Sequence, residues 1–419
     1  MLNRQRQWMR EKLAALTKQL RLNRFDRSLM RYFDWPLFLN VLVISLFGVV
    51  CIFSASTTSV TETPSTIMEM LETQPTDYAR LQLIWLGVGT LAMMAILYFG
   101  YDLYGHYANT FYMLNIVLLL AVLTMEAGRG GMTAFFSWGS GSERTFQPSE
   151  VGKIAMIIAF AKAFSVRVRP VMTVRDLVPL VIYMGIPLLL IIAQPDVGTA
   201  LVYLAVFSIM VFVSGTNYKL ILGVLACVVV LIIPVWIFMN ATNSFRLMRI
   251  LIWLDPESYP DEARQVINAG IAVGRGGMWG QGVVSPGSYA SLGYISDDHT
   301  DFIFAVCCES FGMVGACVLM LLYLLLLGRL FYLALRVQDA YGSYLIIGVA
   351  SMLLFHIVEN ICMVVGILPV TGIPLPFMSY GGSNMITNML GIGLVMNVVM
   401  RSRSREMRNR AITNREIRI

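Results

Sequence analysis

The stretch FIFAVCCESFGMVGACVLMLLYLLLL, residues 302–327, decides the fold of this chain. It is apolar almost throughout, and Glu309 is the one Asp, Glu, Lys or Arg residue in it. An α-helix rises about 1.5 Å per residue, so about 20 apolar residues are enough to cross the hydrocarbon core of a membrane. The stretch therefore predicts a membrane-spanning helix.

Similar apolar runs recur along the 419 residues, of which 57% are hydrophobic and only 13% are charged. An ordinary soluble domain has about 25% charged residues. The predicted fold class is therefore all-α, a polytopic integral membrane protein with about ten transmembrane helices. The predicted spans are Pro36–Ser54, Leu81–Phe99, Ala108–Met125, Ser149–Phe164, Leu177–Ala193, Gly198–Val213, Leu220–Met239, Phe302–Leu327, Tyr344–Gly366 and Asn384–Met400.

The distribution of Lys and Arg predicts the orientation, because these residues accumulate on cytoplasmic loops. Most of the 31 lie in residues 1–35, in the tail 401–419 and in alternate loops between spans. Both termini are therefore expected in the cytoplasm, as basic segments that flank a membrane domain of residues 36–400. The net charge of +6 is mostly a topology signal, and the tail is expected to meet anionic membrane lipids rather than nucleic acid. No signal peptide is expected, because the basic region before the first span is too long.

The longest connection between predicted spans is an outer loop of residues 240–300, between spans 7 and 8. Connections of this length are usually functional, so the chemistry is expected at the outer face. Residues 245–274 alternate cations, apolar residues and acids, as short helices at a lipid surface do. The glycine-rich part GRGGMWGQG, residues 274–282, matches neither nucleotide-binding glycine motif.

The end of this loop, SDDHTDF at residues 296–302, allows three interpretations. Asp297, Asp298 and Asp301 on one helical face could hold magnesium against a diphosphate. Alternatively, they could be solvated acids that cap the following helix. In the third interpretation Asp301 alone is catalytic, because the apolar residues that follow it would partly desolvate its carboxylate. The cap interpretation explains Asp297 and Asp298 well and Asp301 less well.

Two related motifs open spans from the outer side, QPSEVGK at 147–153 and QPDVGTA at 194–200. Proline and an acid suit a first helical turn, so Asp196 is expected to be a helix cap. Glu150 and Lys153 are three residues apart on one helix face and can pair. Ionisable groups at that depth usually face a polar cavity, so a structural ion pair and a substrate contact stay open as alternatives.

The segment GILPVTGIPLPFMSYGGSNMITNMLGIGLV, residues 366–395, is too irregular for a simple span, since its prolines and glycines break a helix. Together with QPSEVGK, QPDVGTAL, HTDFIFAV and the early DWPLFL, it resembles the SEDS family (shape, elongation, division and sporulation), which includes RodA, FtsW and SpoVE. The resemblance runs from about Asp34 to Val399. The early DWP and Pro374 are more similar to RodA than to FtsW.

The resemblance implies a ten-span peptidoglycan glycosyltransferase of the bacterial cytoplasmic membrane. Such an enzyme polymerises the disaccharide of lipid II into a glycan strand, with a class B penicillin-binding protein as its partner. It implies that Asp301 is the catalytic carboxylate. It further implies that Glu150 and Lys153 are cavity residues, that Glu309 is a polar, substrate-binding group along the same span as Asp301, and that an outer-face motif consists of Ser379, Tyr380, Gly381, Gly382 and Ser383.

The sequence departs from the family pattern in three places. Asp297 and Asp298 stand in an unusual lead-in to HTDF, Ser310 stands where a second Glu is common, and the aromatic segment before QPSE is atypical. The first departure leaves open whether Asp297 or Asp298 adds a contact to metal or substrate.

The chemistry expected of Asp301 is removal of a proton from a sugar 4-hydroxyl as it attacks a lipid-linked anomeric carbon. The expected cations are Lys153, Arg246 and Arg249. His299 is the second candidate base, although a His beside a carboxylate more often orients it. No protein metal site is predicted, and Mg or Mn is only a candidate cofactor. His356 and His106 are expected to be structural.

Other functions stay open at this point. A lipid flippase or transporter would use Asp301, Glu150 and Lys153 as coupling groups, although transporters usually place such groups near the membrane midplane. A scaffold for cell-wall enzymes would leave Glu150 and Lys153 unexplained. Within the family, elongation, division and sporulation roles are all compatible with the sequence.

Overall fold

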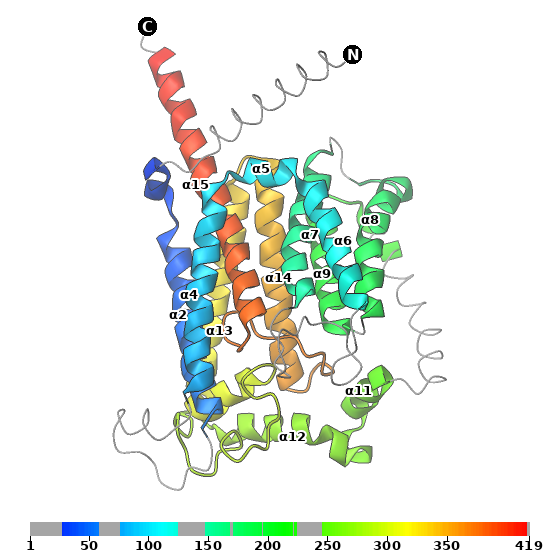
Figure 1. Cartoon of the computed structure of the whole chain (residues 1–419), viewed down its shortest axis with the longest axis vertical. Helices are drawn as coiled ribbons and strands as arrows, with labels where there is room; N and C mark the ends of the chain where they lie inside the picture. Colours follow the sequence, from blue (N-terminus) through cyan, green and yellow to red (C-terminus); the bar gives the residue numbers. More distant parts are fainter. Residues whose placement is uncertain are drawn as a thin grey trace.

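A computed structural model describes residues 27–57, 76–124, 147–167, 171–194, 196–220, 222–223 and 245–416, whose regular elements are helices (Figure 1). The side chains of residues 245–247 and 411–416 lie outside this description. In chain order the helices are η1 (Arg27–Tyr32), α2 (Trp35–Ala55), α4 (Asp77–Tyr98), α5 (Tyr101–His106), α6 (Ala108–Leu123), α7 (Pro148–Ser165), α8 (Val174–Ala193), α9 (Val197–Val213), α11 (Phe245–Leu254), η3 (Pro256–Ser258), α12 (Pro260–Arg275), α13 (Ile303–Arg336), α14 (Ala340–Val364) and α15 (Gly382–Glu416).

The predicted spans correspond to helices wherever the structure describes them. The seventh, Leu220–Met239, lies almost entirely outside the described residues. Within the described part, six helices are long and apolar enough to cross a membrane, namely α2, α4, α8, α13, α14 and α15 up to Arg410. Helices α6 and α9 are shorter apolar helices. The chain is thus an all-helical, multi-pass membrane protein.

The ends of two predicted spans were wrong, since the helices continue beyond the apolar runs. Helix α13 extends nine residues past Leu327 to Arg336 because Leu330, Leu333 and Ala334 continue its buried face. Residues 337–339 therefore form the connection between α13 and α14. Similarly, the first part of the basic tail is the continuation of α15, which projects from the bundle (Figure 1).

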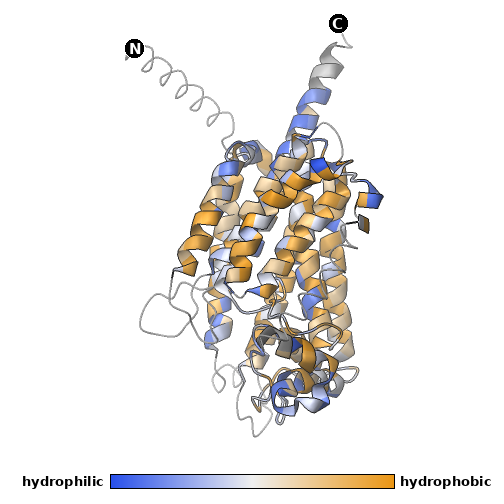
Figure 2. Cartoon of the chain, turned by 90° about the vertical axis from the view of Figure 1, so that its right-hand side faces the viewer, coloured by the Kyte–Doolittle hydropathy of each residue, from blue (hydrophilic) through white to orange (hydrophobic). Residues whose placement is uncertain are grey.

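Helix α14 lies inside the bundle, packed against α7, α9, α13 and α15. The outward faces of α2, α4 and α8 carry exposed apolar side chains such as Leu39, Leu91 and Leu189. Figure 2 shows that apolar residues predominate along the helices of the bundle. In lipid such a surface needs no further cover, whereas polar groups have to be satisfied between the helices.

One end of the bundle, called the basic end here, is held by the buried carboxylate of Asp34. This residue accepts hydrogen bonds from Leu37 N at the start of α2, from Arg329 on α13 and from Arg403 on α15. Burial acts to raise the pKa of Asp34, but the two guanidinium groups and the backbone donor outweigh it and lower the pKa below its usual value. The early DWP motif is therefore a three-helix junction.

The opposite end, called the loop end here, is covered by α11 and α12 (Figure 1). The glycine-rich turn after α12 docks onto the backbone of α13, where Gly312 breaks the helix with φ +65° and ψ −164°. Main-chain bonds join Met313 N to Gly277 O at 2.9 Å and Gly282 N to Ser310 O at 3.0 Å. A β-carbon on Gly280 would collide with the Ser310 carbonyl. These glycines therefore serve close backbone packing, and residues 245–275 form the short helices α11, η3 and α12.

Candidate active site at the loop end

Asp301 lies in the turn that precedes α13, at the loop end. The turn closes on the carbonyl of Asp297, which accepts hydrogen bonds from Thr300 N at 3.1 Å and Phe302 N at 3.2 Å. Asp297 itself has a φ of +54°. Helix α13 begins only after this turn, with no side-chain cap. The expected capping role of Asp297 and Asp298 is therefore wrong, and the three aspartates do not share a helical face.

Asn360 on α14 fixes the backbone of Asp301. Its side-chain amide donates one hydrogen bond to the Asp301 carbonyl and another to the Ile373 carbonyl, both at 2.8 Å. Residue 372 has to be glycine, since its φ is +78° and a β-carbon there would stand 3.2 Å from Asp301 Oδ2. The Asp301 carboxylate thus lies directly against the backbone of the 371–374 segment.

The segment 366–381 is irregular, as its prolines and glycines predicted. It is held by contacts with several other elements. Arg249 on α11 donates to the Val370 carbonyl at 3.2 Å, and Thr371 bonds to the Glu359 carboxylate. At its far end the Ser379 hydroxyl donates to the Thr300 carbonyl at 2.6 Å. The segment therefore ties α11, α14 and the Asp301 turn into one unit.

Arg249 is the cation that the structure places next to Asp301. Burial lowers the pKa of Arg249, and the nearby negative charge of Asp301 opposes this effect. Arg246 lies one turn earlier on α11, but its side chain is outside the described residues. Among the predicted loop cations, Arg249 is thus the one with an observed position.

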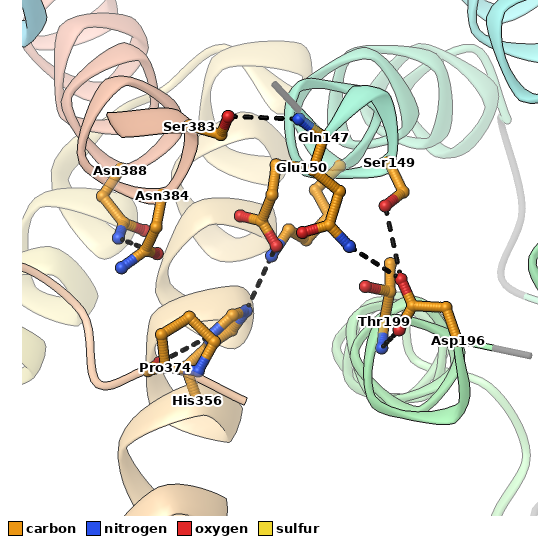
Figure 3. A network of polar contacts seen from close by, with 11 residues as sticks. Gln147, Ser149, Glu150, Asp196, Thr199, His356, Pro374, Ser383, Asn384 and Asn388 are labelled. Carbon is orange, nitrogen blue, oxygen red and sulfur yellow. Dashed lines mark hydrogen bonds and ion pairs between the residues drawn. The ribbon is translucent and has the colours of Figure 1, made fainter. Parts of the chain in front are cut away.

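Glu150, Lys153 and His356 form a buried chain of contacts between α7 and α14 (Figure 3). The Lys153 ammonium donates to Glu150 Oε1 at 2.7 Å and lies 3.1 Å from His356 Nε2. The other ring nitrogen, His356 Nδ1, lies 3.2 Å from the Pro374 carbonyl. No hydrogen-bond partner in the described part of the chain reaches Glu150 Oε2. The predicted pairing of Glu150 and Lys153 is confirmed.

The start of α7 is joined to its neighbours by a second group of contacts, also drawn in Figure 3. Asp196 caps α9 by accepting from Thr199 N at 3.0 Å, which confirms its predicted role. Its other oxygen accepts from the side chains of Gln147 at 2.9 Å and Ser149 at 3.4 Å. Gln147 N donates to the Ser383 hydroxyl at 3.2 Å, which links α7 to α15. The two Gln-Pro motifs therefore bind each other.

Between these two groups of contacts lies a cavity of about 40 Å³. Its lining is polar apart from Val202, Gly372, Ile373 and Pro374. The lining residues are Gln147, Glu150, Lys153, Asp196, Thr199, Val202, His356, Gly372, Ile373 and Pro374. Asp301 does not itself line this cavity, but its carboxylate lies beside Gly372, which does.

The remaining predicted site residues near the loop end have other partners. His299 Nδ1 lies 3.0 Å from Asp298 Oδ1, and its ring stacks on Tyr78 with a centroid distance of 4.7 Å. Tyr380 packs edge-on against Tyr78, and Tyr380 N donates to the His299 carbonyl at 2.8 Å. His299 is thus part of an aromatic cluster with Tyr78 and Tyr380.

Glu309 is buried inside α13, but it does not line the cavity. Its carboxylate accepts from Tyr289 N at 2.7 Å and from Ala290 N at 3.3 Å. It therefore holds the turn that precedes Asp297 in the outer loop. Ser379 likewise uses its hydroxyl within the fold, since it also accepts from Leu375 N at 2.7 Å.

Comparison with known proteins identifies the family. The model of the FtsW, RodA and SpoVE cell cycle proteins matches residues 34–404. The chain belongs to the SEDS family. It is 36% identical over 315 residues to the peptidoglycan glycosyltransferase MrdB of Escherichia coli K12, a match covering 75% of this chain and 83% of that protein. It is 32% identical over 332 residues to the stage V sporulation protein E of Bacillus subtilis 168, covering 78% and 88%.

Solved structures resemble this SEDS protein along most of its length. A structure described as coordinating polymerization and crosslinking in a peptidoglycan synthase complex matches with a TM-score of 0.70 and 29% identity, covering 88% of this chain and 98% of that one. The crystal structure of RodA from Thermus thermophilus matches with a TM-score of 0.62 and 28% identity, covering 88% and 97%. The expected family and fold are confirmed.

The described residues of this SEDS protein include no group of three or more His, Cys, Asp or Glu side chains placed to hold a metal ion. The three-aspartate magnesium interpretation therefore has no geometric support here. The carboxylate of Glu359 on α14 lies near that of Asp301. Glu359 Oε2 has no hydrogen-bond partner within the described residues. Oxygen donors of this kind fit Mg²⁺ or Mn²⁺ when a ligand supplies further oxygens.

Three residues of the candidate site were not predicted from the sequence, and all lie on α14. His356 was expected to be purely structural, whereas it contacts Lys153; Glu359 and Asn360 were not considered. The signal was present in the sequence, because the three are polar residues inside a predicted span at spacings of three and four. What they contact could not be read from it.

Proposed function

We propose that this protein is a peptidoglycan glycosyltransferase that polymerises lipid II into glycan strands at the outer face of the bacterial cytoplasmic membrane, with Asp301 as general base. The loop end is then the outer end. The observation that carries the proposal is the position of Asp301 Oδ2, 3.2 Å from where a β-carbon would stand on Gly372, a residue that lines the same cavity as Lys153. A base and a cation thus serve one site.

The reaction needs one proton acceptor. The sugar 4-oxygen attacks the anomeric carbon of the lipid-linked disaccharide, Asp301 takes its proton, and the bond to the diphosphate breaks. The lipid diphosphate leaves with the bonding electrons. Diphosphate is a good leaving group, so one base and preorganised positive charge are sufficient.

The positive charge comes from Lys153 inside the cavity and Arg249 beside Asp301. The cavity of about 40 Å³ has room for only a few water molecules, so the cavity has to widen before a lipid diphosphate can reach Lys153. We place the diphosphate toward Lys153 and the attacking sugar beside Asp301. Glu150, whose second oxygen has no partner within the described residues, is available to accept a hydrogen bond from substrate.

Arg246, His299, Tyr380 and Ser383 stay secondary substrate contacts in this proposal, while Glu309 and Ser379 act by shaping the outer loop. If a divalent cation takes part, Asp301 and Glu359 would hold it together with diphosphate oxygens. It would supply further neutralisation of the leaving group. Removal of divalent ions by a chelator, followed by Mg²⁺ or Mn²⁺ addition, tests this point.

The proposed partner is a single-span class B penicillin-binding protein, supported by the likeness to a structure of a peptidoglycan synthase complex. We assign the chain to cell elongation and shape, supported by the RodA-like Pro374 and the 36% identity to MrdB. Isolation of the fully active protein from native membranes without a penicillin-binding protein would contradict the proposed partner.

Purified protein supplied with fluorescent lipid II tests the proposed activity. Glycan polymer is the expected product. Movement of lipid II across a vesicle membrane without polymer would instead indicate a flippase, and neither result would indicate a scaffold.

A further inference from the structure

One face of α14 touches both halves of the proposed site. His356 and Asn360 are four residues apart, so they lie one above the other on the helix. Each makes two contacts in different directions. His356 lies between the Lys153 ammonium and the Pro374 carbonyl, and Asn360 lies between the Asp301 and Ile373 carbonyls.

The contacts of His356 fix its tautomer. An ammonium group has only donors, so Nε2 of the ring has to accept from Lys153. A carbonyl oxygen has only acceptor capacity, so Nδ1 has to carry the proton and donate to Pro374. The neutral Nδ1–H form is the one that satisfies both partners.

The direction of the Lys153 ammonium follows from this arrangement. Its hydrogen-bond partners among the described residues are Glu150 Oε1 at 2.7 Å and His356 Nε2 at 3.1 Å. An ammonium has three N–H donors, and one remains for the cavity that Lys153 lines. With Glu150 alone, the group could rotate about a single hydrogen bond; the second acceptor removes that freedom.

We infer that His356 and Asn360 are positioning residues that set the Lys153 ammonium and the Asp301 carboxylate relative to each other, through the adjacent carbonyls of Ile373 and Pro374. This inference rests on the proposed function and deepens it. His356 orients the cation that receives the lipid diphosphate, and Asn360 orients the backbone of the base. Both residues lie on α14, and the helix fixes their positions relative to each other.

A purely structural role predicts a different pattern of effects. A buried histidine that only fills space is replaced well by an apolar residue of similar size. A positioning histidine is replaced well only by a side chain that accepts and donates, as Gln does. Misplacement of a reacting group by about 1 Å can lower a rate by about a hundredfold, even when the fold is intact.

The test compares His356→Leu, His356→Gln and Asn360→Ala in the full-length protein, with Ser351→Ala as the matched control. Ser351 is a buried polar residue on the same helix, and its hydroxyl donates to the Ile347 carbonyl one turn earlier in that helix. Four quantities are measured: kcat and KM for lipid II polymerisation, binding of undecaprenyl diphosphate to the protein in nanodiscs, and the melting temperature.

We expect His356→Leu to weaken undecaprenyl diphosphate binding and to lower kcat by between about tenfold and a hundredfold, while His356→Gln keeps most of both. Asn360→Ala should lower kcat and leave that binding nearly unchanged. Once Lys153 is replaced by Met, His356→Leu should have no further effect on binding. Ser351→Ala should match the parent throughout.

Binding and kcat at the level of the parent in His356→Leu would overturn the inference. It would also be overturned if His356→Leu and His356→Gln lost binding and kcat equally, in proportion to a fall in melting temperature. The inference would also be overturned if His356→Leu weakened undecaprenyl diphosphate binding as much in the Lys153→Met variant as in the parent. If the parent bound undecaprenyl diphosphate but polymerised nothing, the proposed function would fail, while the binding comparison would still decide the role of His356.

Discussion

Asp301 Oδ2 lies 3.2 Å from the position that a β-carbon would occupy on Gly372. The distance is shorter than an ordinary van der Waals contact, so an alanine at this position would have to displace the carboxylate. The φ of +78° adds backbone strain for any other residue. The missing side chain at Gly372 therefore leaves the space that the Asp301 carboxylate occupies.

Gly372→Ala is therefore expected to lower polymerisation by about a hundredfold, because it shifts the base as well as straining the backbone. Gly366→Ala is the matched control: it has the same φ of +78° but no atom within 4 Å of the added β-carbon. Both variants should lose about 1–3 kcal/mol of stability. Equal activity in the two purified variants would contradict the role given to the Gly372 contact.

Asp301→Asn is expected to abolish polymerisation of lipid II while leaving the melting temperature nearly unchanged. The amide keeps the shape of the side chain but cannot take the proton. A purified variant that retained more than a few per cent of the parent rate would show that another group is the base.

The double variant Asp297→Asn/Asp298→Asn should keep substantial activity with an unchanged dependence on divalent ions. Asp297 shapes the turn through its backbone carbonyl, and Asp298 pairs with His299, so neither carboxylate is needed as a ligand. Complete loss of activity that high magnesium restores would return these residues to the site.

Lys153→Met should remove transition-state stabilisation of about 2–4 kcal/mol, the scale of one preorganised donor. Polymerisation would then fall by roughly a hundredfold or more. The double variant Glu150→Gln/Lys153→Met removes both charges and so avoids an unpaired buried carboxylate. Activity near that of the parent in the double variant would mean that Lys153 is only a structural partner of Glu150.

Glu309→Gln is expected to act on stability rather than on chemistry. The carboxylate accepts two backbone N–H groups of the outer loop, and its loss should cost about 1–3 kcal/mol. A lower melting temperature and faster protease cleavage of the loop near Tyr289, with kcat within about twofold of the parent for the folded fraction, would fit this role. A large fall in kcat at unchanged stability would instead place Glu309 at the substrate.

Several elements of the site were accessible to sequence reasoning because their signals are local. Glu150 and Lys153 were expected to pair because three residues separate them on one helix, and Asp196 was expected to cap α9 because it directly precedes it. Asp297 lies in a tight turn rather than at a helix cap, and Glu309 bonds to a loop that its position in a predicted span did not indicate. A tight turn and a loop held by a distant carboxylate leave no periodic pattern in the residues that form them.

The sequence by itself determined the membrane-spanning character, the approximate helices and the candidate groups at the loop end, because the transfer of apolar residues into lipid depends on composition within about 20 neighbouring residues. The tertiary structure alone decided which of those groups share a site. Lys153 meets His356 across 203 positions of the chain, and Asn360 meets Asp301 across 59. Such contacts arise because buried polar groups in lipid have to find partners on other helices, and the packing of α7, α13 and α14 settles which partners are within reach.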